Sequence, residues 1–393
     1  MNENNLGIGG NFGDDEPQFT KIKKQKQRKK KKKSILKIVI AIIVVALLVF
    51  FGYRLFLNIK DSSVKTDNEI AYTPSSNLKC TSFKNIFVTT TVDGVKMVNQ
   101  KGEDVFSEVS EAVSPYIKGM SEIVFLTNDK IVLCYDIKGK TAVLFSESGI
   151  IKTYNFSKKI IKAKMNKDGK FVIITQEDGS KATVRVYNNS GNEIMTWYSG
   201  TGYVVDAQIS DEKSSMAVLT NEVDKSKIFS KILFFTFDNT EPYMGKVISE
   251  STACSLSYTG ESAYIICNDC VYFIDADGDM SKITDFSNKK MKHFKSFSNG
   301  NLLLCYNAPV DESYIVDVYN KNGKQISSFS VDSFLSICDI SEDKFLILKR
   351  KGVVSVSNKG KIIKELSCEY DVKTACYYKD KIAVLSQDKI FLY

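Results

Sequence analysis

From about residue 67 to its end, the chain alternates short apolar runs with short polar turns. One turn recurs after an apolar run: Asn, Asp or Ser opens it, and Gly stands three places later. Copies of this turn begin at Asn99, Ser146, Asn188, Asp275, Asn320 and Ser357, and a degenerate copy without the glycine begins at Asp238. Gly supplies the positive φ that a tight hairpin needs, and Asn, Asp and Ser favour the start of a turn. The pattern predicts a series of antiparallel hairpins.

A second kind of turn precedes an apolar strand in each repeat, and eight such strands can be counted. They lie near Phe87, Val132, Ile173, Val218, Ile265, Leu303, Leu346 and Val384, at spacings of 38 to 47 residues. Four short strands in about 40 residues are typical of one blade of a β-propeller. The sequence therefore predicts an all-β, eight-bladed β-propeller over residues 67–393, with a seven-bladed ring as the alternative. No long helical pattern interrupts the series, which argues against an α/β fold.

The last repeat ends one strand early. Tyr393 aligns with Tyr187 and Tyr319, which directly precede the turn before an outer strand. A ring that lacks this strand would leave an open edge. We expect residues 68–73 to supply the outer strand of the last blade and so to lock the ring.

Residues 35–53 form an apolar stretch with a single charge, Lys37. About 20 apolar residues are needed to cross a ~30 Å hydrocarbon core as a helix. Ten Lys or Arg residues precede the stretch between positions 21 and 33, and such an excess stays in the cytoplasm. No small-x-small cleavage site follows the stretch. The sequence predicts a disordered cytoplasmic tail (1–34), an uncleaved transmembrane signal anchor (35–57), a tether (58–66) and a propeller outside the cell.

The basic character of the chain belongs to this N-terminal region. The formal net charge is +8, yet 41 cations and 42 anions follow residue 60. Lysine clusters beside a membrane attract anionic lipid, at about 1 kcal/mol per residue near the surface. We therefore expect the tail to contact the membrane, and we expect no nucleic-acid partner.

The chemical motifs of the predicted propeller have simpler structural interpretations. Cys267 and Cys270 have zinc-knuckle spacing, but a zinc site needs two more ligands; we interpret them as flanking a hairpin, where a cross-strand disulfide could form. The three carboxylates of residues 275–279 could bind a hard cation, but they fall in the recurrent turn. Most of the nine cysteines fall in predicted first or second strands, where free cysteine packs as a small hydrophobe. With one histidine, His293, we predict no catalytic residues, no metal site and no cofactor.

The longest predicted loops lie on one face of the ring. Connections between second and third strands share a face with the connections between blades, and residues 221–230 and 307–313 are the longest of them. Binding residues often lie on long loops that a rigid scaffold positions. The candidate binding residues are Asn221, Asp224, Lys225, Phe229, Asn307, Pro309, Asp311 and Glu312.

The repeats, the anchor and the basic tail together resemble the membrane-anchored quinoprotein-like and WD40-like propellers of bacteria, and most closely a Gram-positive family of unknown function. The likeness rests on architecture rather than on a motif. Trp197 is the only tryptophan, so the Trp-docking signature of quinone-dependent dehydrogenases is absent, as are the Gly-His and Trp-Asp marks of WD40 repeats. The resemblance adds no catalytic residue.

Two functions stay open from the sequence. The anchor, the closed ring and the missing catalytic set favour a non-catalytic scaffold that binds an envelope protein or polymer outside the cell. The alternative is an extracytoplasmic enzyme, or a ligand- or glycan-binding sensor, that uses the central channel. This alternative predicts polar residues clustered around the channel.

Overall fold

The computed structural model describes residues 68–71, 79–84, 86–99, 101–177, 180–286, 289–297, 299–308, 313–341, 343–386 and 389–393. All of them belong to one compact unit, Lys65–Tyr393. The predicted tail, membrane span and tether (residues 1–66) lie outside the described residues. Within the described part of the chain, no helix is long and apolar enough to cross a membrane.

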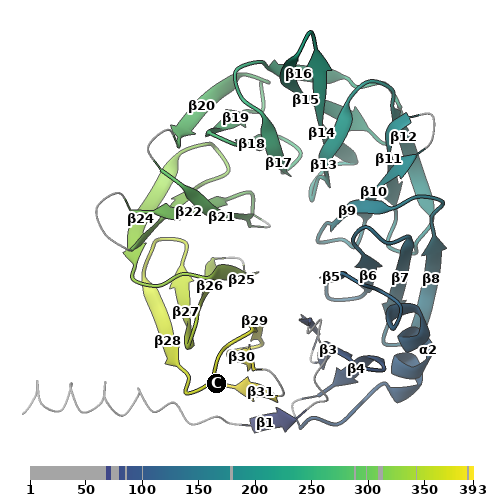
Figure 1. Cartoon of the computed structure of the whole chain (residues 1–393), viewed down its shortest axis with the longest axis vertical. Helices are drawn as coiled ribbons and strands as arrows, with labels where there is room; N and C mark the ends of the chain where they lie inside the picture. The colour runs from purple at the N-terminus through teal and green to yellow at the C-terminus, as the bar shows by residue number, and fades with distance from the viewer. Residues whose placement is uncertain are drawn as a thin grey trace, which may run out of the picture. The chain divides into compact units, whose positions relative to one another are not determined.

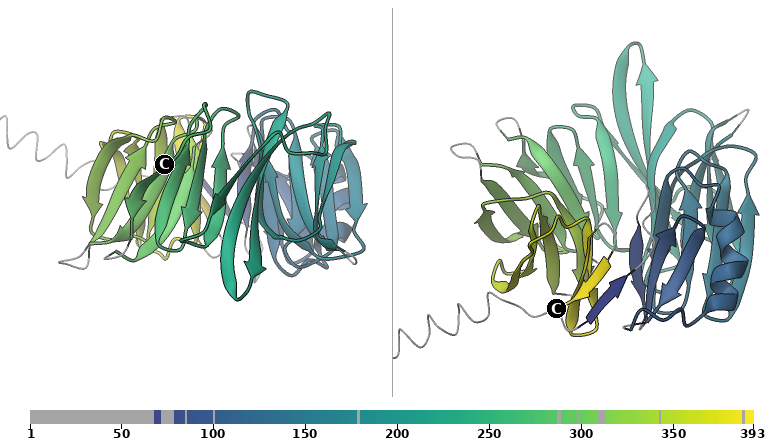
Figure 2. Two further views of the ribbon diagram at one scale, coloured as in Figure 1. Left: turned by 90° about the horizontal axis from the view of Figure 1, so that it is seen from above. Right: turned by 60° about the horizontal axis from the view of Figure 1, so that its bottom comes forward.

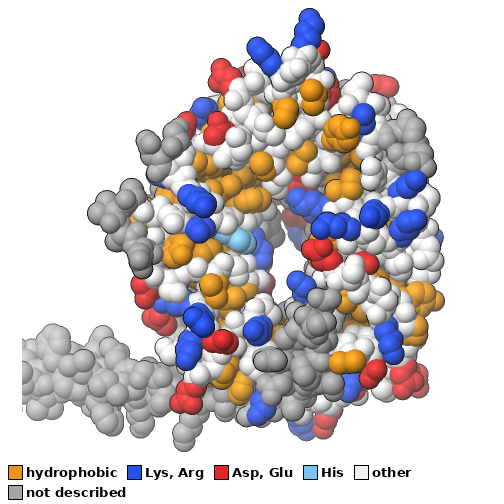
Figure 3. Space-filling view, in the orientation of Figure 1, with side chains coloured by type: hydrophobic (Ala, Val, Ile, Leu, Met, Phe, Trp, Pro, Cys, Tyr) orange, Lys and Arg blue, Asp and Glu red, His pale blue; other side chains and the backbone are white. Residues whose placement is uncertain are grey.

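Eight antiparallel sheets surround a central opening (Figures 1 and 3); seven have four strands and one has three. We number them blades 1 to 8 in chain order and count the strands of each blade from the centre outward. Each of the eight strands counted from the sequence is the second strand from the centre of its blade. The all-β, eight-bladed β-propeller is confirmed, and the seven-bladed alternative is wrong.

The first four blades contain, from the centre outward, β2 (Cys80–Phe83), β3 (Ile86–Thr91) and β4 (Gly94–Val98) in blade 1; β5 (Ile123–Thr127), β6 (Val132–Asp136), β7 (Thr141–Ser146) and β8 (Gly149–Asn155) in blade 2; β9 (Ile160–Met165), β10 (Phe171–Glu177), β11 (Ser180–Tyr187) and β12 (Glu193–Ser199) in blade 3; and β13 (Tyr203–Ile209), β14 (Ser215–Asp224), β15 (Lys227–Thr236) and β16 (Met244–Ile248) in blade 4.

The last four blades contain, in the same order, β17 (Ala253–Tyr258), β18 (Ala263–Cys267), β19 (Cys270–Ile274) and β20 (Met280–Asp285) in blade 5; β21 (Met291–Ser296), β22 (Leu302–Asn307), β23 (Tyr314–Tyr319) and β24 (Gln325–Val331) in blade 6; β25 (Ser336–Ser341), β26 (Lys344–Lys349), β27 (Gly352–Ser357) and β28 (Ile362–Ser367) in blade 7; and β29 (Thr374–Tyr378), β30 (Lys381–Leu385), β31 (Lys389–Leu392) and β1 (Asn68–Ala71) in blade 8.

The ring is closed by its N-terminal strand. β1 is the outer strand of blade 8 and pairs antiparallel with β31, with Asn68 opposite Leu392 and Ala71 opposite Lys389 (Figure 2, right). The closing strand predicted from the sequence is therefore confirmed, although it ends two residues before the end of the predicted segment. Both ends of the repeat series meet in one sheet, so backbone hydrogen bonds join the last blade to the start of the ring.

Blade 1 departs from the four strands that the repeat predicts. After the turn at Asn99 the chain forms helix α2 (Ser107–Ile117) in place of an outer strand. Val109, Val113 and Ile117 recur every four residues and are buried with the facing strands of blades 1 and 2. A spacing of four residues places them on one face of a helix, and this apolar face covers the edge that a fourth strand would otherwise protect.

One hydroxyl shows how the helix protects the edge of β4. Ser114 Oγ accepts the amide hydrogen of Val95 at 3.1 Å and donates to the Ser110 carbonyl at 2.6 Å. The Val95 amide thus has the partner that a fourth strand would have given it. Gly94 permits this approach, because a Cβ there would lie 2.3 Å from the Cβ of Ser114.

The recurrent turn has the geometry that its composition predicts. Its glycines have φ between 78° and 127°, at Gly102, Gly149, Gly191, Gly278, Gly323 and Gly360. In four turns the first side chain accepts the amides two and four places later through its Oδ1 atom, at Asn99, Asn188, Asp275 and Asn320. The acidic segment 275–279 is therefore one copy of a structural turn, as interpreted from the sequence.

The hydrophobic core lies between blades rather than at one centre. Every residue of β6 and of β19 is buried, because these strands have a neighbouring blade on each face. Phe83 of blade 1 packs in one cluster with Phe145 of blade 2, and Leu303 of blade 6 packs in another with Phe345 of blade 7. Burial on both faces explains why the second and third strands are nearly continuous apolar runs.

Candidate functional site

The two faces of the ring carry different connections. The antiparallel order of strands places the second-to-third connections and the inter-blade connections on one face, which we call the connection face. The first-to-second and third-to-fourth turns lie on the other, which we call the turn face. The predicted binding residues that the structure describes fall on second-to-third connections or at their ends, so they belong to the connection face.

The first predicted binding loop, residues 221–230, is in fact a hairpin. β14 continues to Asp224 and β15 begins at Lys227, so the two strands are joined by Lys225 and Ser226 alone. The loop interpretation was wrong because the segment lacks the Gly that marks the other turns. Lys225 and Ser226 adopt φ of 45° and 69° instead, as a type I′ turn requires.

The end of this hairpin extends beyond the rest of its blade. The last residue pair of β13 with β14 is Tyr203 with Asn221, and the last of β15 with β16 is Ser230 with Ile248. Residues 222–229, which we call the ribbon, pair only with each other, and no strand in the described part of the chain pairs with either edge. Figure 2 shows this hairpin projecting past its neighbours.

The ribbon exposes apolar side chains. Val223 and Ile228 stand opposite each other in the register and are 65% and 50% exposed. Tyr203, at the base of the ribbon, is 55% exposed. Apolar groups gathered on a projecting element indicate a contact surface.

A hydrogen-bond network holds the base of the ribbon against blade 5. Ser230 Oγ donates to Asn221 Oδ1 at 2.7 Å and accepts the amide of Ala253 at 2.9 Å. The amide nitrogen of the Asn221 side chain donates to the carbonyl of Ala253 at 3.1 Å. Asn221, predicted as a binding residue, therefore positions the base of the ribbon.

The other side of the ribbon carries an ion pair and an aromatic ring. Glu222 and Lys231 are 2.8 Å apart, and the Lys231 ammonium lies 5.2 Å from the centre of the Phe229 ring. Phe229 is half-buried by this arrangement. The hairpin thus brings Phe229 together with Asp224 and Lys225, three of the predicted binding residues.

The second predicted binding loop is only partly described. Asn307 is the exposed last residue of β22, and its backbone amide donates to the Lys290 carbonyl at 3.2 Å. Pro309, Asp311 and Glu312 lie outside the described residues. Asn307 belongs to blade 6, so the structure does not bring it onto the blade 4 hairpin.

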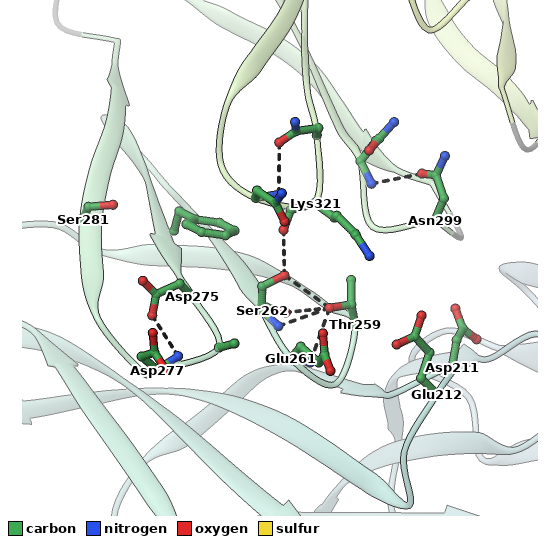
Figure 4. A pocket seen from close by; sticks show the side chains of 15 residues that line it. Asp211, Glu212, Thr259, Glu261, Ser262, Asp275, Asp277, Ser281, Asn299 and Lys321 are labelled. Carbon is green, nitrogen blue, oxygen red and sulfur yellow. Dashed lines mark hydrogen bonds between the residues drawn. The ribbon is translucent and has the colours of Figure 1, made fainter.

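A groove of about 880 Å³ opens on the turn face across blades 4, 5 and 6 (Figure 4). Its acidic lining side chains are Asp211, Glu212, Glu261, Asp275 and Asp277, with Lys321 as the basic one. Several of these acids have structural partners: Asp211 accepts the backbone amide of Lys167 at 2.8 Å, and Glu261 pairs with Lys213 at 3.4 Å. Among the described residues, no group of three or more His, Cys, Asp or Glu is placed to hold a metal ion. We therefore assign these acids to the turns.

A polar cluster lies on the first strands, around the central opening. Asp206 of β13 is fully buried, and the Lys162 and Lys164 ammonium groups of β9 each lie 2.8 Å from its Oδ2 atom. The same carboxylate accepts the Ser255 hydroxyl at 2.6 Å and the Leu256 amide at 3.0 Å. Lys164 also donates to the Leu256 carbonyl at 2.6 Å. The cluster therefore ties blades 3, 4 and 5 together.

The charges of this cluster stabilise one another. Burial alone would raise the pKa of Asp206, but Lys164 and Lys162 outweigh burial and hold this pKa below its usual range. Burial lowers the pKa of Lys164, and Asp206 opposes the change. Lys and Arg side chains gather around the opening in Figure 3, so the polar channel expected for a ligand-binding propeller is present. Within it, both lysines of the cluster pair with the single carboxylate of Asp206.

Asp339 holds the equivalent position in blade 7. Asp206 and Asp339 each follow a bulge in the first strand of their blade, and Asp339 accepts an amide of the next blade, that of Tyr377, at 2.7 Å. Its second oxygen accepts the amide of Ile340 at 2.8 Å. Burial raises the pKa of Asp339. The amides that bond to Asp339 do not reverse this rise, whereas the two ammonium groups reverse it at Asp206.

The nine cysteines are all free thiols. Cys267 and Cys270 are buried and flank the hairpin between β18 and β19, as interpreted from the sequence. Cys254 differs from the prediction of buried packing, because it is exposed. It is the bulged residue between Ala253 and Ser255, and a bulge re-aims its side chain.

Solved structures support the fold. The computationally designed protein Ika8 matches with a TM-score of 0.56 at 13% identity, over 84% of this chain and 99% of that one. The Dos1 propeller matches with a TM-score of 0.52 at 11% identity, over 84% and 94%. BamB from Moraxella catarrhalis matches with a TM-score of 0.45 at 10% identity, over 84% and 99%. Identities this low show the fold alone.

Comparison by sequence identifies a family. No curated protein sequence matches the chain. A family model described as "Family of unknown function (DUF5711)" matches residues 58–391, which covers the whole ring of blades.

Proposed function

Because the chain belongs to the DUF5711 family, whose function is unknown, we propose a function from its own residues. The protein is a non-catalytic, membrane-anchored scaffold whose propeller binds an envelope protein outside the cell through the ribbon of blade 4.

The anchored location is supported by the N-terminal sequence. An apolar stretch long enough to span a bilayer follows ten cations, which keep the tail in the cytoplasm and attract anionic lipid. Residues 35–57 form the single span, and the tether 58–66 leads to β1. In this arrangement the propeller lies outside the cell and close to the membrane.

The ribbon is the observation that carries the binding proposal. Val223 and Ile228 are large apolar side chains on an element already held in place by the Asn221–Ser230–Ala253 network. Preorganised apolar anchors lose little entropy on binding and supply much of an interface's energy. The open edges of the ribbon also offer backbone groups to a partner strand. Both features suit a protein partner better than a polysaccharide.

The binding proposal is tested by removing the apolar pair. Val223→Ser with Ile228→Ser should reduce recovery of the envelope protein that co-purifies after mild detergent extraction by at least roughly tenfold, since loss of two anchors should cost more than about 1.4 kcal/mol of binding free energy. The matched control is Ile362→Ser with Ile363→Ser, because these outer-strand side chains of blade 7 are 56% and 54% exposed. Equal recovery of the same proteins with both double variants would show that the ribbon is not the contact.

The location is tested with the exposed thiol. Cys254 should react with a membrane-impermeant maleimide on intact cells if the propeller is outside, since it is the cysteine with an exposed side chain. Cys254→Ser should remove most of this labelling. Labelling that occurs only after cell lysis would place the propeller inside and reject the proposed location.

A further inference from the structure

The seam between blade 8 and blade 1 is where the ring could open. Its innermost strands, β2 and β29, are in contact, and its outer side is closed by the β1–β31 ladder. If the tether pulls on the chain, β1 is the first strand to bear the load. Blade 1 follows it directly along the chain.

Two thiols face each other across this seam. Cys80 lies in β2 and Cys376 in β29, the innermost strands that meet at the seam. Cys80 Sγ donates to the Thr81 carbonyl at 3.8 Å. Cys80 packs against the cluster of apolar residues that contains Cys376. The two cysteines therefore belong to one packed cluster at the seam between blade 8 and blade 1.

The two thiols differ in access. Cys376 is 8% exposed, whereas Cys80 is half-buried, so Cys80 is the sulfur that a small reagent meets first. The neighbouring Cys80 thiol, and then burial, raise the pKa of Cys376.

We propose that Cys80 and Cys376 form a disulfide that locks the seam of the propeller. The oxidant is a low-molecular-weight disulfide. The Cys80 thiolate attacks it, forms a mixed disulfide and releases one thiolate. Cys376 then loses its proton to solvent and attacks the Cys80 sulfur, which releases the second thiolate. One protein disulfide forms, and the reagent disulfide is reduced to two thiols.

The position of this bond gives it a specific role. It joins the second strand of the chain to the first strand of the last blade, so it encloses nearly the whole ring in one covalent loop. A ring locked in this way stays closed even when β1 separates from β31. By contrast, a Cys267–Cys270 bond would join only two adjacent strands of blade 5. An oxidising location in the cell rests on the proposed function, but the reaction itself is a property of the folded protein.

The proposal is tested on full-length protein purified in detergent. After incubation with oxidised glutathione and alkylation of the remaining thiols, peptide mass mapping should find Cys80 linked to Cys376, with the mass of two hydrogens lost. The oxidised protein should unfold about 5 °C higher than the reduced one.

Two single variants sharpen the test. Cys80→Ser should abolish the link and the rise in unfolding temperature. Cys338→Ser is the matched control, because Cys338 lies in β25, the first strand of blade 7, and donates to the Leu346 carbonyl at 3.5 Å; the link should persist in it. Full alkylation of both Cys80 and Cys376 in oxidant-treated wild-type protein, or a Cys338–Cys376 link in its place, would overturn the proposal. Neither result depends on the partner of the ribbon, so the two proposals fail separately.

Discussion

Two aspartates in equivalent positions show how neighbours decide the role of a residue. Asp206 and Asp339 each accept an amide of the next blade, and asparagine could keep that hydrogen bond. Asp206 is also the carboxylate that both Lys162 and Lys164 contact. Asp206→Asn should therefore lower the free energy of unfolding by about 3 kcal/mol, since it weakens two charge-assisted hydrogen bonds. Asparagine at position 339 offers one acceptor oxygen to the two amides that Asp339 accepts, so Asp339→Asn should lower this free energy by about 1 kcal/mol.

Asp206 and Asp339 should make the free energy of unfolding change with pH in opposite directions. The folded-state pKa of Asp206 is lowered, so its stabilisation is present above about pH 4 and is lost as the pH falls below that value. The folded-state pKa of Asp339 is raised. Protonated Asp339 therefore contributes its full stability below about pH 4, and this contribution is lost as the pH rises through the raised pKa of the folded state. Urea unfolding of the wild type and both variants, from about pH 3 to 7, measures both slopes. Slopes that change in the same direction in both variants would contradict this assignment.

At the scale of elements, the repeat pattern predicted most of the fold. Turn residues and apolar runs are local signals, so the eight second strands and the closing strand could be placed from the sequence. The helix of blade 1 could not, because a single hydroxyl at Ser114 and a missing Cβ at Gly94 let it replace a strand. Its only sequence signal was the spacing of Val109, Val113 and Ile117, which is short and contains Pro115 before its end.

The candidate site was predicted less completely than the fold. The hairpin of residues 221–230 was located, but as a loop, because Lys225 and Ser226 adopt positive φ without Gly or Asn. Val223 and Ile228 were missed for the same reason: alternating exposure becomes visible only when the segment is read as two strands. The polar cluster required knowledge of which blades are neighbours, since Lys164 reaches a carbonyl two blades away.

At the scale of the whole molecule, the propeller is a circle of interfaces between blades with one seam. Each cluster of core residues joins two neighbouring blades, so the loss of one interface does not remove the others directly. The seam is different, because β1 and the rest of blade 8 come from opposite ends of the chain. Closure should therefore depend on the short β1–β31 ladder more than on any single blade.

Glu69→Pro with Ile70→Pro tests this dependence in the full-length protein. In an antiparallel pair, one of any two successive amides points toward the partner strand, here β31. Proline has no amide hydrogen to donate, so replacing both residues removes the hydrogen bond at whichever of the two positions forms it. Amide hydrogen exchange should become faster in β29, β30 and β31 and stay unchanged in blades 3 to 5. Asn58→Pro with Ile59→Pro, in the predicted tether, is the control and should leave all these rates unchanged.

If the Cys80–Cys376 link forms, the oxidised double variant should recover most of its protection in β29, because that strand is then held to β2 covalently. Unchanged exchange in β31 of the reduced variant would show that the seam is held by its inner strands and that β1 does not lock the ring.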